Sequence, residues 1–165
     1  MAAVIEIFEL TASEVGTEKT SGTVRFKLAN DQTVDSSDPI TIPSTGAYQT
    51  HSYTKNLRLY CATVPDTYID NLECYSDASN DFGSGVTVNA SQINDFLTNA
   101  TTWERGSDLF AFTSAAAMDL DAFHTASVNA TGFCGDIVLL QMLVASAASS
   151  GTLGAETVTF SYDEV

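Results

Sequence analysis

The chain has 165 residues, of which 21 are acidic and 6 are basic, so its formal net charge is −15. This length favours one domain over residues 1–165, with enough chain to bury a core that needs neither a disulfide nor a metal. The charge disfavours nucleic acid and anionic membranes as partners, because both need a basic surface and Arg105 is the last Lys or Arg.

The N-terminal segment Val4–Leu10 is apolar but is interrupted by Glu6 and Glu9. It has no basic leader, so we do not interpret it as a signal peptide and expect synthesis in the cytoplasm. The longest apolar run, residues 137–145, is too short for a membrane span.

Alternating apolar and polar residues predict several short strands. Residues 24–28 and 157–162 alternate with period two, which indicates strands with one buried face. Residues 136–145 are apolar at odd and even positions, as in a central strand covered on both faces. Further strands are predicted at 57–61, 69–76 and 86–88. The predicted core is Val24, Phe26, Leu28, Leu57, Leu59, Leu72, Val86, Val88, Leu139, Leu143, Val158 and Phe160.

The long connection 89–135 precedes the penultimate predicted strand. Ser91–Leu97 has an N-cap residue and apolar residues at helical spacing, and residues 114–123 are a second helix candidate. With seven or eight short strands and one or two short helices, the pattern predicts an all-β antiparallel β-sandwich, jelly-roll or Ig-like. Long connections are commonly functional loops.

No catalytic constellation is visible in the sequence. His51 and His124 lie in no catalytic motif, and Gly83-Ser84-Gly85 lacks the GxSxG spacing and indicates a tight turn. The acidic loop Asp77–Asp81 is the best calcium candidate, although Asp, Asn and Gly also gather in turns. We therefore expect a protein that is not an enzyme, with no catalytic residue, no metal site and no cofactor.

The three cysteines, Cys61, Cys74 and Cys134, are odd in number and show no CxxC spacing. Neither a zinc ribbon nor a disulfide framework fits this pattern. We expect three reduced, buried thiols, with Cys61 and Cys74 on paired strands.

Two segments carry candidate interface residues. Aromatic residues and Arg dominate interface hot spots, but the aromatic residues of the connection can equally pin their own loop or stack on sugar rings. No second tryptophan supports a carbohydrate platform. The N-terminal segment is apolar enough to add a strand to the sheet edge of a neighbour. The candidates are Val4, Ile5, Ile7, Phe8, Phe96, Trp103, Arg105, Phe110 and Phe112.

Three stretches together, about half of the chain, are similar to parts of a known protein family. They are Lys55–Tyr60, Tyr68–Asp77 running through Phe82–Val86, and the ending Gly154–Val165. They resemble small virion structural proteins of tailed bacteriophages, in which an I-x-N-L-x-x-Y-S/T-D hairpin is followed by an apolar penultimate strand and a closing T-x-x-Y-D-E strand. The segment Asp136–Val144 is similar to that penultimate strand.

The resemblance implies a capsid decoration, or cement, protein that stabilises the exterior of a virion shell. Such proteins bind the major capsid protein of the same virion, often as trimers, so the implied partners are that protein and copies of this chain. The alternatives are a tail or head-to-tail completion protein, or a β-sandwich carbohydrate-binding module for host adsorption.

Overall fold

Strands make up 44% of the chain and helix 2% in the computed structural model. The structure describes residues 1–13, 15–44, 48–102, 105–124 and 127–165. The elements in chain order are β1 (Val4–Ala12), β2 (Val15–Glu18), β3 (Gln49–His51), β4 (Lys55–Thr63), β5 (Ile69–Ser76), β6 (Val86–Ile93), β7 (Ser107–Asp108), the 3-10 turn η1 (Leu109–Ala111), β8 (Met118–Asp119), β9 (Gly132–Ala145) and β10 (Val158–Glu164).

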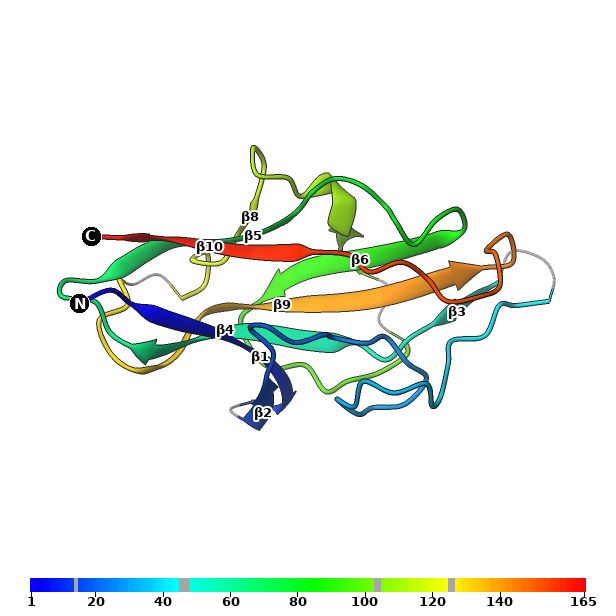
Figure 1. The fold of residues 1–165 in the computed structure, drawn as a ribbon, viewed down its shortest axis with the longest axis horizontal. Helices are drawn as coiled ribbons and strands as arrows, with labels where there is room; N and C mark the ends of the chain where they lie inside the picture. The colour runs from blue at the N-terminus through cyan, green and yellow to red at the C-terminus, as the bar shows by residue number, and fades with distance from the viewer. Residues whose placement is uncertain (14, 45–47, 103–104, 125–126) are drawn as a thin grey trace.

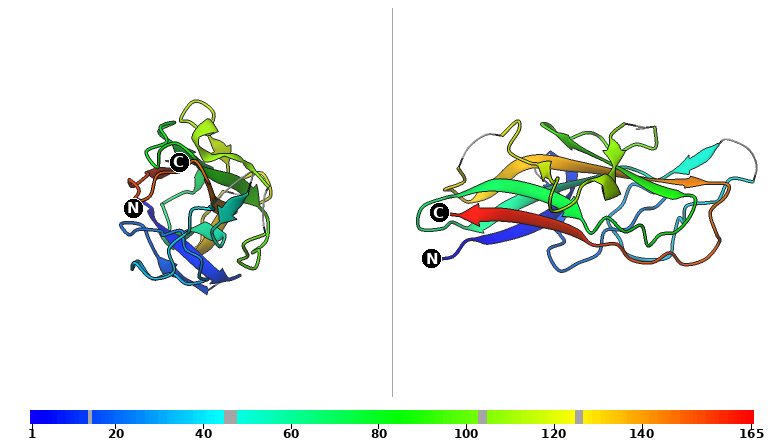
Figure 2. Two further views of the ribbon diagram at one scale, coloured as in Figure 1. Left: turned by 90° about the vertical axis from the view of Figure 1, so that its right-hand side faces the viewer. Right: turned by 90° about the horizontal axis from the view of Figure 1, so that it is seen from above.

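The strands form two antiparallel sheets that face each other (Figure 1, Figure 2). The larger sheet has the order β2-β1-β4-β9-β6-β7, with β3 also paired to β9, and the smaller has the order β10-β5-β8. Both termini lie at one end of the molecule, and β3 lies at the other (Figure 1). The predicted all-β antiparallel class is confirmed. In the part of the chain that the structure describes, no helix is long and apolar enough to cross a membrane.

The core lies between the two sheets. Leu57, Leu59, Leu72, Val86 and Val88 are buried there, as predicted from their alternation with polar residues. Of the other predicted core residues, Val24, Phe26, Val158 and Phe160 are partly buried against this core, Leu28 is half-buried, and Leu139 and Leu143 are buried outside the main cluster.

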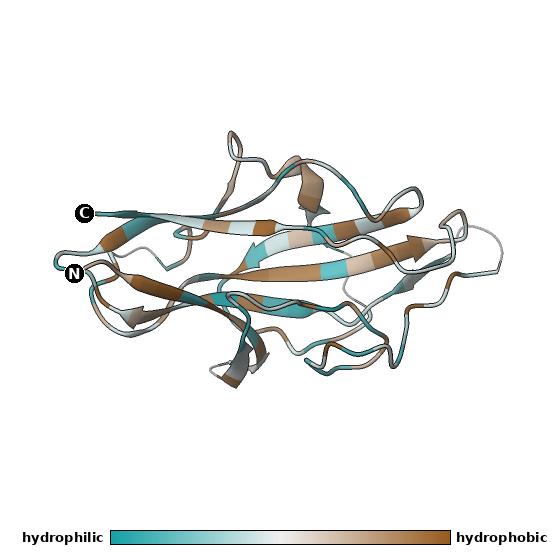
Figure 3. Ribbon diagram, in the orientation of Figure 1, coloured by the Kyte–Doolittle hydropathy of each residue, from teal (hydrophilic) through white to brown (hydrophobic). Residues whose placement is uncertain are grey.

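Strand β9 is covered on both faces, as its continuous apolar sequence predicts, and it is hydrophobic over most of its length in Figure 3. The chain itself supplies the second cover. The side chain of Gln141 donates to the Ser52 carbonyl oxygen over 2.9 Å. Nearby, the Asn56 side chain donates to the Leu97 carbonyl oxygen (3.0 Å) and to Asn99 (2.8 Å). Residues 97–100 thus cover the outer face of the larger sheet around Asn56 and Gln141.

Three predicted elements are wrong. Residues 24–28 form no strand, because Lys27 turns inward and is fully buried instead of facing water. Ser91–Ile93 is the end of β6 and pairs with Ile137–Leu139 of β9, so no helix begins there. Residues 114–123 contain β8 and no helix, because Met118 and Leu120 are buried against the smaller sheet. Pairing and burial override the local pattern in all three cases.

The stretch from β5 to β6 is also not a hairpin. Strand β5 belongs to the smaller sheet and β6 to the larger one, so residues 77–85 connect the two layers. The glycines of this connection have positive φ, +88° at Gly83 and +80° at Gly85. The turn predicted at Gly83–Gly85 is present, and the Val86 N–H donates to the Gly83 carbonyl oxygen over 3.4 Å.

Candidate functional site

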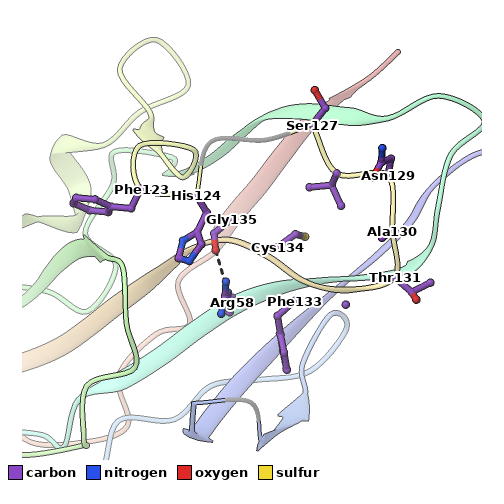
Figure 4. A pocket seen from close by; sticks show the side chains of 12 residues that line it. Arg58, Phe123, His124, Ser127, Asn129, Ala130, Thr131, Phe133, Cys134 and Gly135 are labelled. Atoms are coloured by element: carbon purple, nitrogen blue, oxygen red, sulfur yellow. Dashed lines mark hydrogen bonds between the residues drawn. The ribbon is translucent and has the colours of Figure 1, made fainter.

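An open pocket of about 450 Å³ lies where β9 begins, at the end of the sandwich that carries both termini (Figure 1, Figure 4). Its walls come from β4, which supplies Arg58, from Phe123 and His124, and from residues 127–135. Three local features build it: a bulge in β9, a buried carboxylate and a cluster of aromatic rings.

The bulge displaces two residues of β9 from the ladder. Leu59 pairs with Cys134, but Leu57 pairs with Val138, so the register shifts between them. Gly135 has φ +64°, and a Cβ there would lie 2.9 Å from Leu72 Cδ1. Only glycine combines this backbone with so close an approach. The Gly135 carbonyl oxygen then accepts a 3.0 Å hydrogen bond from Arg58 Nε, which places the guanidinium beside the pocket.

Asp136, the next residue, is fully buried with 0% of its surface exposed. Its carboxylate accepts the backbone N–H groups of Phe123 and His124, each over 3.1 Å, and lies 2.9 Å from His124 Nδ1. Burying a carboxylate costs several kcal/mol unless hydrogen-bond donors surround it. Here the three donors offset that cost and fix Phe123 and His124 at the mouth of the pocket.

The contact with Asp136 also orients the imidazole. Because an ionised carboxylate can only accept hydrogen bonds, His124 Nδ1 is the donor in this pair. In the neutral ring Nε2 is therefore the acceptor and the nitrogen left for a ligand.

A second carboxyl, Asp121, is half-buried and interacts electrostatically with Asp136. Burial raises its pKa, the hydrogen bond from the Leu72 N–H (2.9 Å) acts in the opposite direction, and Asp119, Asp136 and Asp70 raise it further. Its Oδ1 is buried and has no hydrogen-bond partner in the described residues. No group of three or more His, Cys, Asp or Glu among the residues that the structure describes could hold a metal ion.

Three aromatic rings pack beside the pocket on β1, β4 and β9. The ring centroids are 5.4 Å apart for Phe8 and Tyr60, 5.5 Å for Phe8 and Phe133, and 5.2 Å for Tyr60 and Phe133. Arg58 Cζ lies 5.9 Å from the Phe133 centroid, within the range of a cation–π contact. Phe8, an interface candidate, is therefore half-buried in this cluster.

Most of the basic side chains are withdrawn from the surface. Lys55 and Glu9, each 1% exposed, form an ion pair of 2.8 Å, and Lys19 lies 3.7 Å from the same carboxylate. Lys27, 0% exposed, contacts Asp31 at 3.0 Å and Asp35 at 2.9 Å. The contact of Lys19 with Glu9, together with a 2.7 Å hydrogen bond from Lys55 Nζ to the Asp31 carbonyl oxygen, ties the irregular segment 19–43 to the larger sheet.

The carboxylates around Lys27 are perturbed. The Thr33 hydroxyl and then Lys27 lower the pKa of Asp31 to about 2. The Ser37 hydroxyl and then Lys27 hold the pKa of Asp35 far below its usual range. Burial alone would lower the pKa of Lys27, but its hydrogen bonds with Asp35 and Asp31 outweigh burial, so that pKa is raised.

The surface that remains is acidic. Among the described residues only one basic side chain, Arg105, is exposed. Eleven acidic residues are exposed, namely Glu18, Asp35, Asp38, Asp66, Asp77, Asp81, Asp95, Asp108, Asp119, Asp163 and Glu164. The sequence predicted the sign of the charge, but not that folding removes most basic residues from the surface.

The N-terminal interface candidates mostly serve their own sheet. Val4–Leu10 pairs with β4, and Phe8–Ala12 also pairs with β2, so this segment is no free strand for a neighbour. Ile5 and Ile7 pack against the core, and only Val4, 48% exposed, faces solvent. The strand-addition hypothesis is thus wrong for Phe8–Leu10, whose backbone pairs with both β2 and β4, and it stays a prediction for Val4–Glu6, which pair with β4 alone.

The interface candidates in the connection 89–135 likewise include residues that pack within the chain and residues that face solvent. Phe110 packs edge-on against Phe82, with the centroids 6.5 Å apart, and Phe112 packs against the core. Phe96 is half-buried and Arg105 is exposed. Trp103 lies outside the described residues.

The acidic loop Asp77–Asp81 holds itself by local hydrogen bonds. Asp77 accepts the Ser79 N–H (2.9 Å), and Asp81 accepts the Ser79 hydroxyl (3.0 Å). These contacts are those of a turn.

The three cysteines are free and buried. The expected proximity of Cys61 and Cys74 through paired strands is wrong, because β4 and β5 belong to different sheets. Cys61 instead shares the larger sheet with Cys134, and burial raises the pKa of Cys134 to about 12. Such a thiol is a poor nucleophile.

Sequence reasoning missed the pocket. The available signal was Gly135-Asp136, a glycine and a charged residue inside an apolar strand, which is typical of a bulge. That Asp136 binds His124 depends on the tertiary structure. Comparison of the chain with models of known protein families, with curated proteins and with solved structures gave no match.

Proposed function

We propose that this chain is a virion structural protein that binds the exterior of a tailed-bacteriophage capsid as a decoration protein. The proposal that it is a virion structural protein comes from the resemblance of residues 55–60, 68–86 and 154–165 to such proteins. The observation that supports a docking role best is the acidic surface, on which Arg105 is the one exposed basic residue of the described chain.

The acidic surface restricts the partner. At a net charge of −15, the protein is repelled by other acidic surfaces. Attraction to a shell then requires a basic patch on the major capsid protein, which also steers the encounter. The buried pair Lys55–Glu9 strengthens this selectivity, because Lys55 is paired inside the sheet and adds no positive charge to the surface.

Stabilisation of the shell would follow from mass action. A protein that binds only the assembled lattice stabilises it by its binding free energy, without any catalytic step. We propose a trimer on the shell, as the family resemblance implies. The alternative structural role is a tail or head-to-tail completion protein.

The test is binding of the purified protein to undecorated shells, followed by co-sedimentation and by cryo-electron microscopy. Raising the salt from about 0.1 M to about 1 M shortens the Debye length from about 10 Å to about 3 Å, so binding should weaken markedly. Repeated copies over the whole shell are expected. Copies confined to the tail or neck, or binding that does not change with salt, would contradict the proposal.

The double variant Asp163→Lys/Glu164→Lys and the double variant Asp77→Lys/Asp81→Lys reverse the same number of exposed charges in two different regions, the C-terminal strand and the β5–β6 connection. A shell contact localised in one region should respond to one variant and not to the other. Equal, small effects of both would show that neither region touches the shell.

A further inference from the structure

We propose that the free edge of strand β10 binds an extended peptide segment in which Lys or Arg alternates with apolar residues. The segment adds a strand to the smaller sheet, antiparallel to β10. Such binding goes beyond contact with a shell, because the edge takes a segment of this chemistry from any protein that carries it. Three features of the molecule support it: the unpaired backbone of β10, the protection of the other sheet ends and the acidic face beside β10.

One end of β10 shows which of its backbone groups are unpaired. Strand β10 is the last of the order β10-β5-β8, so only β5 pairs with it. Just beyond the two strands, Tyr68 and Val165 exchange hydrogen bonds of 3.4 Å and 3.0 Å. Bonded and non-bonded pairs alternate in an antiparallel ladder, so Glu164 turns its N–H and C=O away from β5. Ile69, opposite Glu164, accordingly bonds to Val128 over 3.0 Å and 2.8 Å.

The same alternation continues to the other end of β10. Ser76, opposite Val158, donates its N–H to the Phe112 carbonyl oxygen over 2.9 Å, so Val158 also turns outward. The extra residue at the register shift falls on β5, where Asn71 has φ +51°, and β10 stays regular. No backbone hydrogen bond from another described segment reaches the outward residues of β10, which are Val158, Phe160, Tyr162 and Glu164.

The other sheet ends are short or covered, which is how proteins protect exposed edges. Strands β2, β7 and β8 have four residues or fewer, whereas β10 has seven. Next to β2, the edge of β1 is capped: the Ala3 N–H donates to Glu164 (3.0 Å), the Ile7 N–H donates to Thr20 (2.9 Å), and the Ile7 carbonyl oxygen accepts from Lys19 (2.7 Å). Strand β10 lies at the front in Figure 1, with no described segment drawn across it. It is therefore an edge open to a partner.

The outer face beside this edge is acidic. Ser161 pairs with Glu73, which pairs in turn with Asp119, and Asp163 pairs with Asp70. Strands β5, β8 and β10 contain no Lys or Arg, and none of these carboxylates forms an ion pair with another described residue. Two copies joined at β10 would bring only carboxylates together. A segment with Lys or Arg compensates them, so charge favours a basic partner over a second copy.

The inner side of the edge is apolar. Val158 and Phe160 are partly buried against the core, and Tyr162, two residues further along the same face, is 36% exposed. The side chains of an added strand lie on the same face as the residues opposite them. The segment therefore needs apolar residues beside this face and basic residues beside the outer one, which carries Thr159, Ser161 and Asp163.

Amide hydrogen exchange of the full chain, followed by NMR, tests the proposal with a synthetic peptide as long as β10, Lys-Val-Lys-Val-Lys-Val-Lys, capped at both ends. In the protein alone, the amides of the outward residues should exchange faster than those of their neighbours Thr159, Ser161 and Asp163, which bond to β5. Saturating peptide should slow exchange of the outward amides by about tenfold or more, because they become hydrogen-bonded.

Three further peptides separate backbone pairing from charge. In the antiparallel arrangement the valines lie opposite the outward residues and exchange hydrogen bonds with them, whereas the backbone groups of the lysines point away. Methylating the backbone nitrogens of the valines should therefore abolish binding, and methylating those of the lysines should not. A peptide with Glu in place of each Lys should not bind.

Two charge variants give the matched comparison in the protein. Asp163→Lys/Glu164→Lys reverses two charges on β10 and should weaken binding of the peptide by about tenfold or more. Asp77→Lys/Asp81→Lys reverses the same number of charges away from this edge and should weaken it much less.

The proposal is overturned if the peptide does not bind, if the two methylated peptides bind alike, or if the two double variants weaken binding equally. It is also overturned if the outward amides become protected in the protein alone as its concentration rises, since two copies would then pair at β10. Shell binding by a protein that does not bind the peptide would overturn it and leave the decoration proposal standing, whereas peptide binding without shell binding would do the reverse.

Discussion

Two glycines in one turn allow the cost of backbone conformation to be separated from the cost of a clash. Gly83 and Gly85 both have positive φ, +88° and +80°. A Cβ on Gly83 would meet nothing within 4 Å, whereas a Cβ on Gly85 would lie 2.5 Å from Ala148 N and 2.8 Å from Ala148 Cα. These atoms are backbone, so they cannot move aside as the end of a side chain can.

Alanine at either position must adopt a left-handed conformation, which destabilises the folded chain by about 1–2 kcal/mol. Part of this loss is offset because alanine also lowers the conformational entropy of the unfolded chain. Gly83→Ala should therefore lower the free energy of unfolding by about 1 kcal/mol. Gly85→Ala adds overpacking of about 1–3 kcal/mol, for a total of about 2–4 kcal/mol. For a chain of this size these losses correspond to a Tm decrease of about 3 °C for Gly83→Ala and of about 6–12 °C for Gly85→Ala.

Urea unfolding followed by far-ultraviolet circular dichroism measures both variants against the wild type. The expected order is wild type, Gly83→Ala, Gly85→Ala, with the larger step at the second substitution. Equal losses in the two variants would refute the close approach of Gly85 to the backbone of Ala147 and Ala148.

Three further predictions concern the core and the charged groups. Leu59→Ala should lower the free energy of unfolding by about 2–5 kcal/mol, because Leu59 is 1% exposed and its loss leaves a cavity; a decrease below about 1 kcal/mol in urea unfolding would place it outside the core. Below pH 3.8 the Asp121 carboxyl is neutral in both the folded and the unfolded chain, so Asp121→Asn should be as stable as the wild type there. As the pH rises through the raised pKa of the folded protein, the wild type loses stability and the variant should become the more stable protein. Tm values measured across pH 3 to 7 check the sign of this difference. The pKa of Asp31 is lowered from 3.8 to about 2, so the ionised carboxylate stabilises the folded chain at pH values above 3.8. This contribution is lost as the pH falls toward about 2. Lys27→Met should reduce that acid-dependent loss of Tm, and an unchanged pH profile would show that Lys27 does not stabilise the ionised carboxylates.

The hydrophobic pattern by itself determined the class of the fold and much of its core. Leu57 and Leu59 alternate with polar neighbours, and the structure buries both between the sheets. The unbroken apolar sequence of β9 likewise predicted cover on both faces. These predictions succeed because the side chains of a strand alternate between its two faces, so the spacing of apolar residues indicates which faces are buried.

Tertiary structure alone decided the partners of each element. The alternation at residues 24–28 looked like a strand, but Lys27 is buried because Asp31 and Asp35 fold back onto it. The turn after β5 was compatible with a hairpin, and only packing sends β6 into the other sheet. The pocket depends on the same kind of contact: Asp136 orients His124 twelve residues away through a bulge that register fixes. Local sequence sets which face of a strand is apolar, whereas long-range pairing sets the neighbour, because register and the compensation of buried charge are properties of two segments at once.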